Sequence, residues 1–337
     1  MSITIISDIS KIDTNKWYDF LLNHPNGNVF QSPYMYEVYD KTLNFQPYIF
    51  VAFKDNEIEG ILLSYIQKQI RGPLSYLSSR SIIWGGAIVK DNNPEIINRL
   101  LIAYDKINNK KVVYTQIRNL FSTDYCKDVF DSHVYLFEDH LNILVDLSKS
   151  EDELWKGINS NGRNKIRIAK TKNCLFEVKQ DTESLVKCYK ILKDIYNKAK
   201  LPLNDIEYFI NLLKNSDNQV QLKIFTINYG GEIVACRLAL LYANLIYDLF
   251  AGSDKNYSHL HPNDLITWEI FKWGKNNGYT VFDFGEAGKP YIAYGVREYK
   301  KKFGGEMVNY GRYEKIYSKY KYTIARRGFR LWQLMKH

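Results

Sequence analysis

The two halves of the chain repeat one pattern, and this repeat limits the possible folds more than any other feature. Near residue 50 the sequence reads FVAFKDNEIEGILLSYI, and near residue 225 it reads FTINYGGEIVACRLALLY. Each copy is an apolar run, a polar turn that ends in Glu-Ile (Glu57-Ile58, then Glu232-Ile233) and a second apolar run, which predicts a β-hairpin. Solenoid repeats are roughly 20–50 residues long, so a period as long as this one indicates a duplicated domain.

A second pair of segments supports the duplication. WGGAIVKDNNPEIINRLLIAYDKINNKKVVYTQI in the first half corresponds to FAGSDKNYSHLHPNDLITWEIFKWGKNNGYTVFDF in the second. Pro94 aligns with Pro262 and Asn108 with Asn276, and these positions mark the start and the end of a predicted helix in each copy. The expected fold class is therefore α/β, a tandem duplication in which each half has a mixed sheet with helices on its faces.

The last residues have no counterpart in the first half. We expect a first domain over 1–145, a second over 146–312, and a basic amphipathic helix over 313–337 that packs on the first domain. Its cations Lys319, Arg326 and Arg330 are expected to stay exposed. The stripe expected to pack consists of Tyr317, Tyr320, Ile324, Leu331 and Leu334.

Charge and cysteine usage indicate a compartment and a kind of partner. The net charge of +9 favours an anionic partner such as a phosphate-bearing substrate, tRNA or an acidic membrane surface, without choosing among them. The four cysteines have no metal-binding spacing, and His259 and His261 lack a third ligand, so no metal is expected.

The start lacks the features of a signal peptide. The longest uncharged apolar run, 238–247, is about half a membrane span, and we expect a cytoplasmic protein.

Each half is expected to run strand, helix, helix, antiparallel strands, long helix and strand. This order is similar to that of GNAT acyltransferases. The glycine-rich loop that binds the coenzyme A pyrophosphate in that fold is missing from both copies, at VKDNNPE and SDKNYSHLHPND. Five segments follow one another along the chain: FQSPYMYEV near 30, NGRNKIRIAKTKN, IEYFINLL at 206, DLFAGSDKNY with HPNDLITWEIFKWGKNNGYTVFDFGE, and EYKKKFGGE at 298–306. Through these segments, two such domains in tandem without the loop resemble the Fem family of peptidoglycan aminoacyl and peptidyl transferases, in its compact, armless form.

The resemblance implies an acyltransferase without a bound cofactor, which uses aminoacyl-tRNA or acyl-coenzyme A as a co-substrate and an amine of a cell-envelope precursor as acceptor. Compact members that bind a nucleotide-linked muropeptide contact its pyrophosphate with two cations, and here Glu37 and the stretch 202–205 (PLND) stand at those places. Transfer to a peptidoglycan peptide is favoured over N-acylation of an amino sugar of capsule or lipopolysaccharide. A non-catalytic module that binds nucleic acid or anionic lipid, including peripheral contact with a membrane, is the alternative of another class.

The expected catalytic residues lie in the second half. Lys300 matches the lysine that the family is thought to use against the tetrahedral oxyanion, with Tyr299 before it helping through its backbone; alternatively, Lys300 belongs to an exposed basic run. Asp283 and Glu286 follow a predicted strand, where α/β sheets place their sites. Asp283 could instead cap the next turn, whereas Glu286 could orient or deprotonate the amine. Thr115 aligns with Asp283 in the first half, which favours the second domain as the catalytic one.

Further residues are candidates for substrate binding. Tyr208, Tyr257 and Asn263 lie in segments that carry the resemblance. Arg163 and Arg167 share a helical face and could contact phosphates of tRNA or of a lipid-linked pyrophosphate, or else they belong to a solvated helix. No G-x-S-x-G element is present, which argues against a covalent acyl-enzyme.

Overall fold

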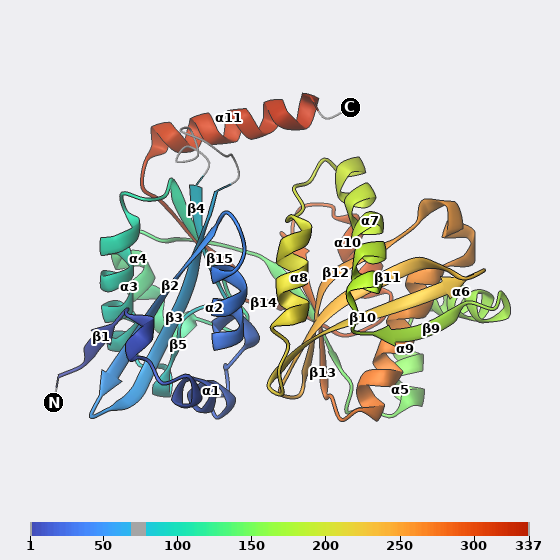
Figure 1. The fold of residues 1–337 in the computed structure, drawn as a ribbon, viewed down its shortest axis with the longest axis horizontal. Coiled ribbons are helices and arrows are strands. Elements are labelled where there is room, and N and C mark those ends of the chain that lie inside the picture. The colour runs from blue at the N-terminus through green and yellow to red at the C-terminus, as the bar shows by residue number, and fades with distance from the viewer. Residues whose placement is uncertain (1, 69–78, 336–337) are drawn as a thin grey trace. The chain divides into compact units, whose positions relative to one another are not determined.

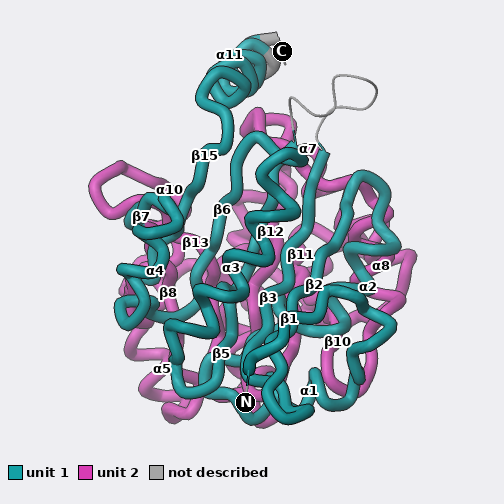
Figure 2. The backbone as a smooth tube through the Cα atoms, turned by 90° about the vertical axis from the view of Figure 1, so that its left-hand side faces the viewer, with its two compact units in different colours: residues 1–139, 310–337 teal, residues 140–309 magenta. Residues whose placement is uncertain are grey.

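The computed structural model describes residues 2–68 and 79–335 and consists of two compact units. Unit 1 comprises residues 1–139 and 310–337, and unit 2 comprises residues 140–309 (Figure 2). The boundaries expected at 145 and 312 fall a few residues beyond the observed ones. The difference arises because two short strands belong to the sheet of the other half of the chain.

Unit 1 contains a mixed sheet of strand order β1-β2-β3-β4-β6-β15-β7, with β5 paired to β3 (Figure 1). Helix α3 packs on β2 and β3, and its buried face joins the core with strand residues such as Phe50 and Leu62. The strands are β1 (Thr4–Ile6), β2 (Phe45–Lys54), β3 (Glu57–Lys68), β4 (Ser79–Trp84), β5 (Ile88–Val89), β6 (Tyr114–Arg118), β7 (Leu136–Glu138) and β15 (Arg312–Ile316). The α-helices are α1 (Thr14–Leu22), α2 (Pro33–Asp40), α3 (Pro94–Asn108), α4 (Lys127–Ser132) and α11 (Lys319–Met335).

Unit 2 contains a sheet of order β14-β8-β13-β12-β11-β10-β9. Alternate residues of its strands face opposite sides: Phe225 and Ala239 join the core under α9, whereas Cys236 contacts α7 through Cys188. The strands are β8 (Leu141–Asp146), β9 (Leu175–Lys179), β10 (Val220–Tyr229), β11 (Glu232–Tyr242), β12 (Leu245–Ser253), β13 (Val281–Gly288) and β14 (Glu306–Asn309). The α-helices are α5 (Glu151–Gly157), α6 (Ser160–Thr171), α7 (Thr182–Lys198), α8 (Ile206–Lys214), α9 (Pro262–Asn276) and α10 (Gly295–Lys301).

The duplication is visible in the strand register. The β2–β3 hairpin has a bulge at Glu59, and the β10–β11 hairpin has a bulge at Val234, each directly after the Glu-Ile of its turn. Helices α3 and α9 are both 15 residues long, start with proline and end with asparagine. Bulges are specific features of a strand pair, so a shared bulge position confirms that the two halves repeat one unit.

Each sheet contains one strand from the other half of the chain. Strand β8 follows the first half but pairs antiparallel with β13 in unit 2. Strand β15 follows the second half but pairs antiparallel with β6 in unit 1. The two strands occupy equivalent places in the two sheets, so the chain exchanges strands between its halves.

The C-terminal segment forms a helix over Lys319–Met335 and not from residue 313 as expected, because residues 312–316 form β15. Of the expected apolar stripe, Tyr317 contacts unit 1, where its hydroxyl donates to Asp105 at 2.8 Å, but the residues in the helix do not pack as expected. Side chains of the stripe are exposed in α11, among them Tyr320 (78%) and Leu334 (66%). The helix is held through Tyr322 instead, whose ring lies 5.3 Å from that of Tyr114 and whose hydroxyl donates to Glu314 at 2.8 Å. The sequence pattern identified an amphipathic helix, but the face that attaches it is a different one. Within the described residues, no helix is both long enough and apolar enough to cross a bilayer.

Candidate active site

The parallel strands β12 and β13 separate toward their carboxyl ends. Their last pair is Tyr247 with Asp283, although β12 continues to Ser253 and β13 to Gly288. Beyond that pair each strand follows its other neighbour, since β12 stays paired with β11 and β13 with β8. Gly285 lies in β13 just after the split with φ of +67°, a backbone conformation that glycine adopts without strain. The result is a wedge between the two strands.

Lys300 enters this region from α10. Its ammonium donates to the main-chain carbonyls of Phe284 at 2.5 Å and of Glu286 at 2.7 Å. Both carbonyls belong to the part of β13 that has no pairing with β12. Lys300 is half-buried, whereas Lys301 beside it is exposed. Lys300 is therefore held in the structure and does not belong to an exposed basic run.

Buried charges surround the Lys300 ammonium. Burial lowers the pKa of Lys300, and the carboxylates of Asp248, Asp283 and Glu286 act against this by favouring the charged form. Asp248 of β12 forms a buried ion pair with Arg237 of β11. Burial raises the pKa of Asp248, and the Arg237 and Lys300 charges oppose that rise. Cations and carboxylates thus stabilise one another in a place from which water is largely excluded.

Asp283 has a structural and an electrostatic role in the same place. Its carboxylate accepts a hydrogen bond of 2.6 Å from the main-chain N–H of Gly285, so it does cap the turn in which β13 bends. Burial raises the pKa of Asp283 to about 6, while the Gly285 N–H and the Lys300 charge oppose the rise. The carboxyl group therefore titrates much closer to neutral pH than an ordinary aspartate does.

The Tyr299 side chain, next to Lys300 in α10, links β11 to the start of α9. Its hydroxyl accepts from Arg237 at 3.1 Å, donates to the main-chain carbonyl of Asn263 at 2.8 Å, and lies 2.9 Å from the Thr267 hydroxyl. Burial raises the pKa of Tyr299 to about 12, so the phenol stays protonated. Asn263 also donates from its side chain to Ser253 at the end of β12. The structure thus brings together the candidates Lys300, Tyr299, Asp283 and Asn263.

Sequence reasoning missed Arg237 and Asp248. A signal for them exists, because each is a charged residue inside an otherwise apolar strand, in ACRLALLY and LIYDLF. Charged residues are almost never fully buried unless they are paired, so each one predicted an ion-pair partner. That the partner is the other residue could not be deduced, because an irregularity between Leu238 and Ala239 shifts the register of the β11–β12 hairpin between the two charged positions.

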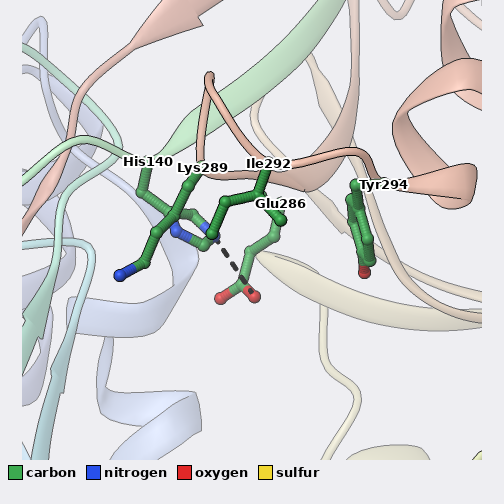
Figure 3. Close-up of a pocket in the computed structure, with 6 residues that line it drawn as sticks. His140, Glu286, Lys289, Ile292 and Tyr294 are labelled. Carbon is green, nitrogen blue, oxygen red and sulfur yellow. Dashed lines mark ion pairs between the residues drawn. The ribbon is translucent and has the colours of Figure 1, made fainter.

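The main chain of Glu286 contacts Lys300 in the wedge, and its side chain faces a separate hollow of unit 2. Its main-chain carbonyl accepts from Lys300, and its carboxylate faces an open hollow of about 270 Å³ in unit 2. Figure 3 shows the carboxylate directed toward the His140 ring, at 3.8 Å, with Tyr294 on the other side of Glu286. The hollow is lined by His140, Glu286, Gly288, Lys289, Ile292 and Tyr294.

The remaining candidates for substrate binding lie outside this cluster or make structural contacts. Tyr208 is 2% exposed and packs on Phe209, and Tyr257 packs beside Tyr229. Arg163 donates to the main-chain carbonyl of Ile158 at 2.5 Å, at the end of α5. Arg167 is exposed and stacks on Trp155, with its guanidinium 5.4 Å from the ring. Their role in substrate binding stays a prediction.

The start of α9 does not fit the pyrophosphate of coenzyme A. In the GNAT fold, bare main-chain amides at this helix start bind the phosphates. Here Pro262, which has no N–H, is the first helical residue, and the buried carboxylate of Asp264 follows, paired with Lys302. The N–H groups of Asp264 and Leu265 donate to the His261 carbonyl, so they are not bare amides that could bind a phosphate. Across the described residues, no group of three or more potential ligands is arranged to hold a metal ion.

Known proteins share this fold. Residues 160–301, which include α9, β13 and Lys300, match the family model described as acetyltransferase (GNAT) domain. The lipid II:glycine glycyltransferase of Staphylococcus aureus (strain USA300) is 20% identical over 86% of this chain and 88% of its own length. The crystal structure of FemX has a TM-score of 0.72 at 16% identity and covers all of both chains. A tandem GNAT protein from the clavulanic acid biosynthesis pathway has a TM-score of 0.62 at 7% identity, covering 94% of this chain and 99% of the other.

The fold and the matches define an acyltransferase made of two GNAT-like domains in tandem. Within that class, the chain is homologous over most of its length to the Fem-type lipid II:glycine glycyltransferases. This homology confirms the resemblance that the five sequence segments carry.

Proposed function

We propose that the enzyme transfers an aminoacyl group to an amine of a peptidoglycan precursor, with the reaction centre in the wedge of unit 2. The observation that carries this proposal is the Lys300 ammonium, held by two carbonyls of β13 where β13 has left β12. An ammonium has three N–H donors. Two are used by these carbonyls, and the third can be donated to a substrate.

In the proposed reaction, the acceptor amine attacks the ester carbonyl of the donor. A C–N bond forms, the carbonyl electrons move onto oxygen, and the tetrahedral intermediate then collapses with loss of the alcohol of the ester. Lys300 stabilises the oxyanion with its charge and its third N–H, a contribution that is large in a site with little water. The amine loses one proton and the departing alkoxide gains one, so the reaction is balanced without a covalent enzyme intermediate.

Glu286 is suited to receive the acceptor amine. Its carboxylate is 39% exposed toward the hollow, while its carbonyl is bonded to Lys300. A carboxylate in this position attracts an ammonium group and can accept its proton before attack. Asp283 lies too deep for this role, at 3% exposed, and we assign it the positioning of the β13 bend.

The proposed donor is an aminoacyl-tRNA, because the start of α9 offers few bare amides to a coenzyme A pyrophosphate: Pro262 has no N–H, and the N–H groups of Asp264 and Leu265 donate to the His261 carbonyl. The net charge of +9 favours association with a polyanion, and the exposed Arg167 is a candidate phosphate contact. The relatives are lipid II:glycine glycyltransferases, which supports a lipid-linked acceptor and peripheral contact with an anionic membrane. N-acylation of an amino sugar is the second candidate, and it is favoured by the loss of the two muropeptide cations at Glu37 and 202–205.

Mass spectrometry of acceptor products tests the proposal. The enzyme is incubated with charged tRNA or with acyl-coenzyme A, each in the presence of peptidoglycan precursors and of amino sugars. We expect a mass increase of one aminoacyl residue on the peptide amine with charged tRNA. Acylation of an amino sugar from acyl-coenzyme A would establish the second candidate instead. Transfer from neither donor would favour the non-catalytic module.

A further inference from the structure

Helix α11 presents an apolar face at the surface of unit 1. Its side chains lie within one sector of the helix, at 100° per residue. Within α11 the apolar stripe consists of Tyr320 (78% exposed), Ile324 (39%), Leu331 (59%) and Leu334 (66%), whereas Tyr317 precedes the helix. Single exposed apolar residues are ordinary, but a contiguous apolar surface indicates a binding partner.

A cationic sector lies directly beside the stripe. It contains Lys319, Arg326 and Arg330, all exposed. Arg327 lies within the apolar sector itself, and Lys321 lies beyond it. The helix contains five Lys and Arg residues and no Asp or Glu. The partner of this face must therefore offer apolar volume and negative charge side by side.

The attachment of α11 leaves both sectors accessible. Tyr322, which holds the helix against Tyr114 and Glu314, points to the side opposite the apolar stripe. The main-chain N–H of Tyr317 bonds to Val113 just before the helix begins. In Figures 1 and 2, α11 stands beyond the end of β15, with the C-terminus at its far end.

We propose that α11 is an interfacial helix that binds the surface of an anionic lipid bilayer. Its stripe enters the boundary between headgroups and acyl chains, and the neighbouring cations contact acidic headgroups, an arrangement typical of amphipathic membrane-surface helices. An acidic protein or a nucleic acid would satisfy the cations but leave the stripe in water. This proposal does not depend on the transfer reaction, but it would place unit 1 at the membrane where a lipid-linked acceptor lies.

Vesicle sedimentation of the full-length enzyme tests this proposal. We expect binding to phosphatidylcholine vesicles that contain phosphatidylglycerol, with less binding at high salt and little binding to phosphatidylcholine alone. The double variant Leu331→Gln/Leu334→Gln should bind at least about tenfold more weakly, because two apolar side chains no longer enter the bilayer. Gln has nearly the helix propensity of Leu, so the helix persists. The variant Arg326→Gln/Arg330→Gln should lose about tenfold at low salt and much less at high salt.

Two matched variants serve as controls. Ile102→Gln removes an equally exposed apolar residue from α3, and Lys190→Gln/Lys193→Gln removes two exposed cations from α7; both should bind vesicles like the wild type. Equal, negligible binding of the wild type to both kinds of vesicle would overturn the proposal, as would unchanged binding of the leucine variant. A lipid-free dimer that the leucine variant dissociates would assign the stripe to a second copy. A lowered melting temperature of that variant would assign the stripe to the chain's own packing. Transfer to a soluble acceptor is measured separately, so failure here leaves the proposed function untouched.

Discussion

Equivalent pairs of parallel strands stay hydrogen-bonded to their ends in unit 1 but separate in unit 2. In unit 1, β4 and β6 stay paired from Arg80 with Tyr114 to Trp84 with Arg118, and the N–H of Gly85 continues the pairing to the Arg118 carbonyl at 2.9 Å. In unit 2, β12 and β13 part after three pairs, and Lys300 binds the carbonyls of β13 beyond the split. Two copies of one fold thus differ in whether this pair of strands separates toward its carboxyl end. The difference supports our proposal that the chemistry takes place in unit 2.

We expect the largest effect on the free energy of unfolding from a substitution in the buried ion pair of unit 2, Arg237 with Asp248. Arg237→Met leaves the buried carboxylate of Asp248 without its ion-pair partner, and removing one partner of a buried pair costs about 3–5 kcal/mol. We expect a loss of this size in the free energy of unfolding, measured with denaturant. The double variant Arg237→Met/Asp248→Leu should recover most of it. A loss below about 1 kcal/mol for Arg237→Met would show that the pair does not hold the wedge.

The sequence predicted the local parts of this comparison well. The hairpins, the proline-started helices and the region around Lys300 are encoded by apolar periodicity, turn residues and short motifs. The exchange of β8 and β15 was not predicted, because the residues of a strand do not specify a partner strand in the distant half of the chain. The tail helix lies on unit 1 as expected. The prediction that its apolar stripe packs there was wrong, because a stripe on a helix shows that one face is apolar but not what covers it. The pairing of Arg237 with Asp248 was missed for another reason, because the register of the β11–β12 hairpin shifts between these residues.

Asp283 should make the stability of unit 2 depend on pH in a way that its counterpart in unit 1, a neutral threonine, cannot. Its pKa is raised to about 6 from the usual 3.8, so its contribution to stability is present below about pH 4 and is lost as pH rises to 6. The loss amounts to about 3 kcal/mol. Asp283→Asn keeps an oxygen for the Gly285 N–H but does not titrate. Relative to the wild type, the variant should gain this amount of stability between pH 4 and pH 7 in thermal unfolding. A difference that does not change with pH would contradict the assigned pKa.

We expect the smallest effect on stability and activity from a substitution where β4 and β6 stay paired at their carboxyl ends in unit 1. Arg118 lies over the Trp84 ring, 5.1 Å from its centre, and bonds to Gln116 at the last β4–β6 pair. We expect Arg118→Gln to lower the free energy of unfolding by less than about 1 kcal/mol, as for a partly exposed cation–π contact. Transfer activity should stay within about twofold of wild type. A large loss of transfer activity would show that unit 1 takes part in the chemistry.

The most direct test of the account is the rate of acyl transfer by Lys300→Met, compared with Lys301→Met. Both variants remove one ammonium from α10, but only Lys300 is bonded to the carbonyls of the wedge, whereas Lys301 is exposed beside Glu298. Losing an oxyanion donor lowers turnover by roughly 10²–10³. We therefore expect a fall of this size in kcat for Lys300→Met, measured at a temperature where the variant is folded, and turnover near wild type for Lys301→Met. A Lys300→Met enzyme within about twofold of wild type would contradict the placement of the reaction centre in the wedge of unit 2.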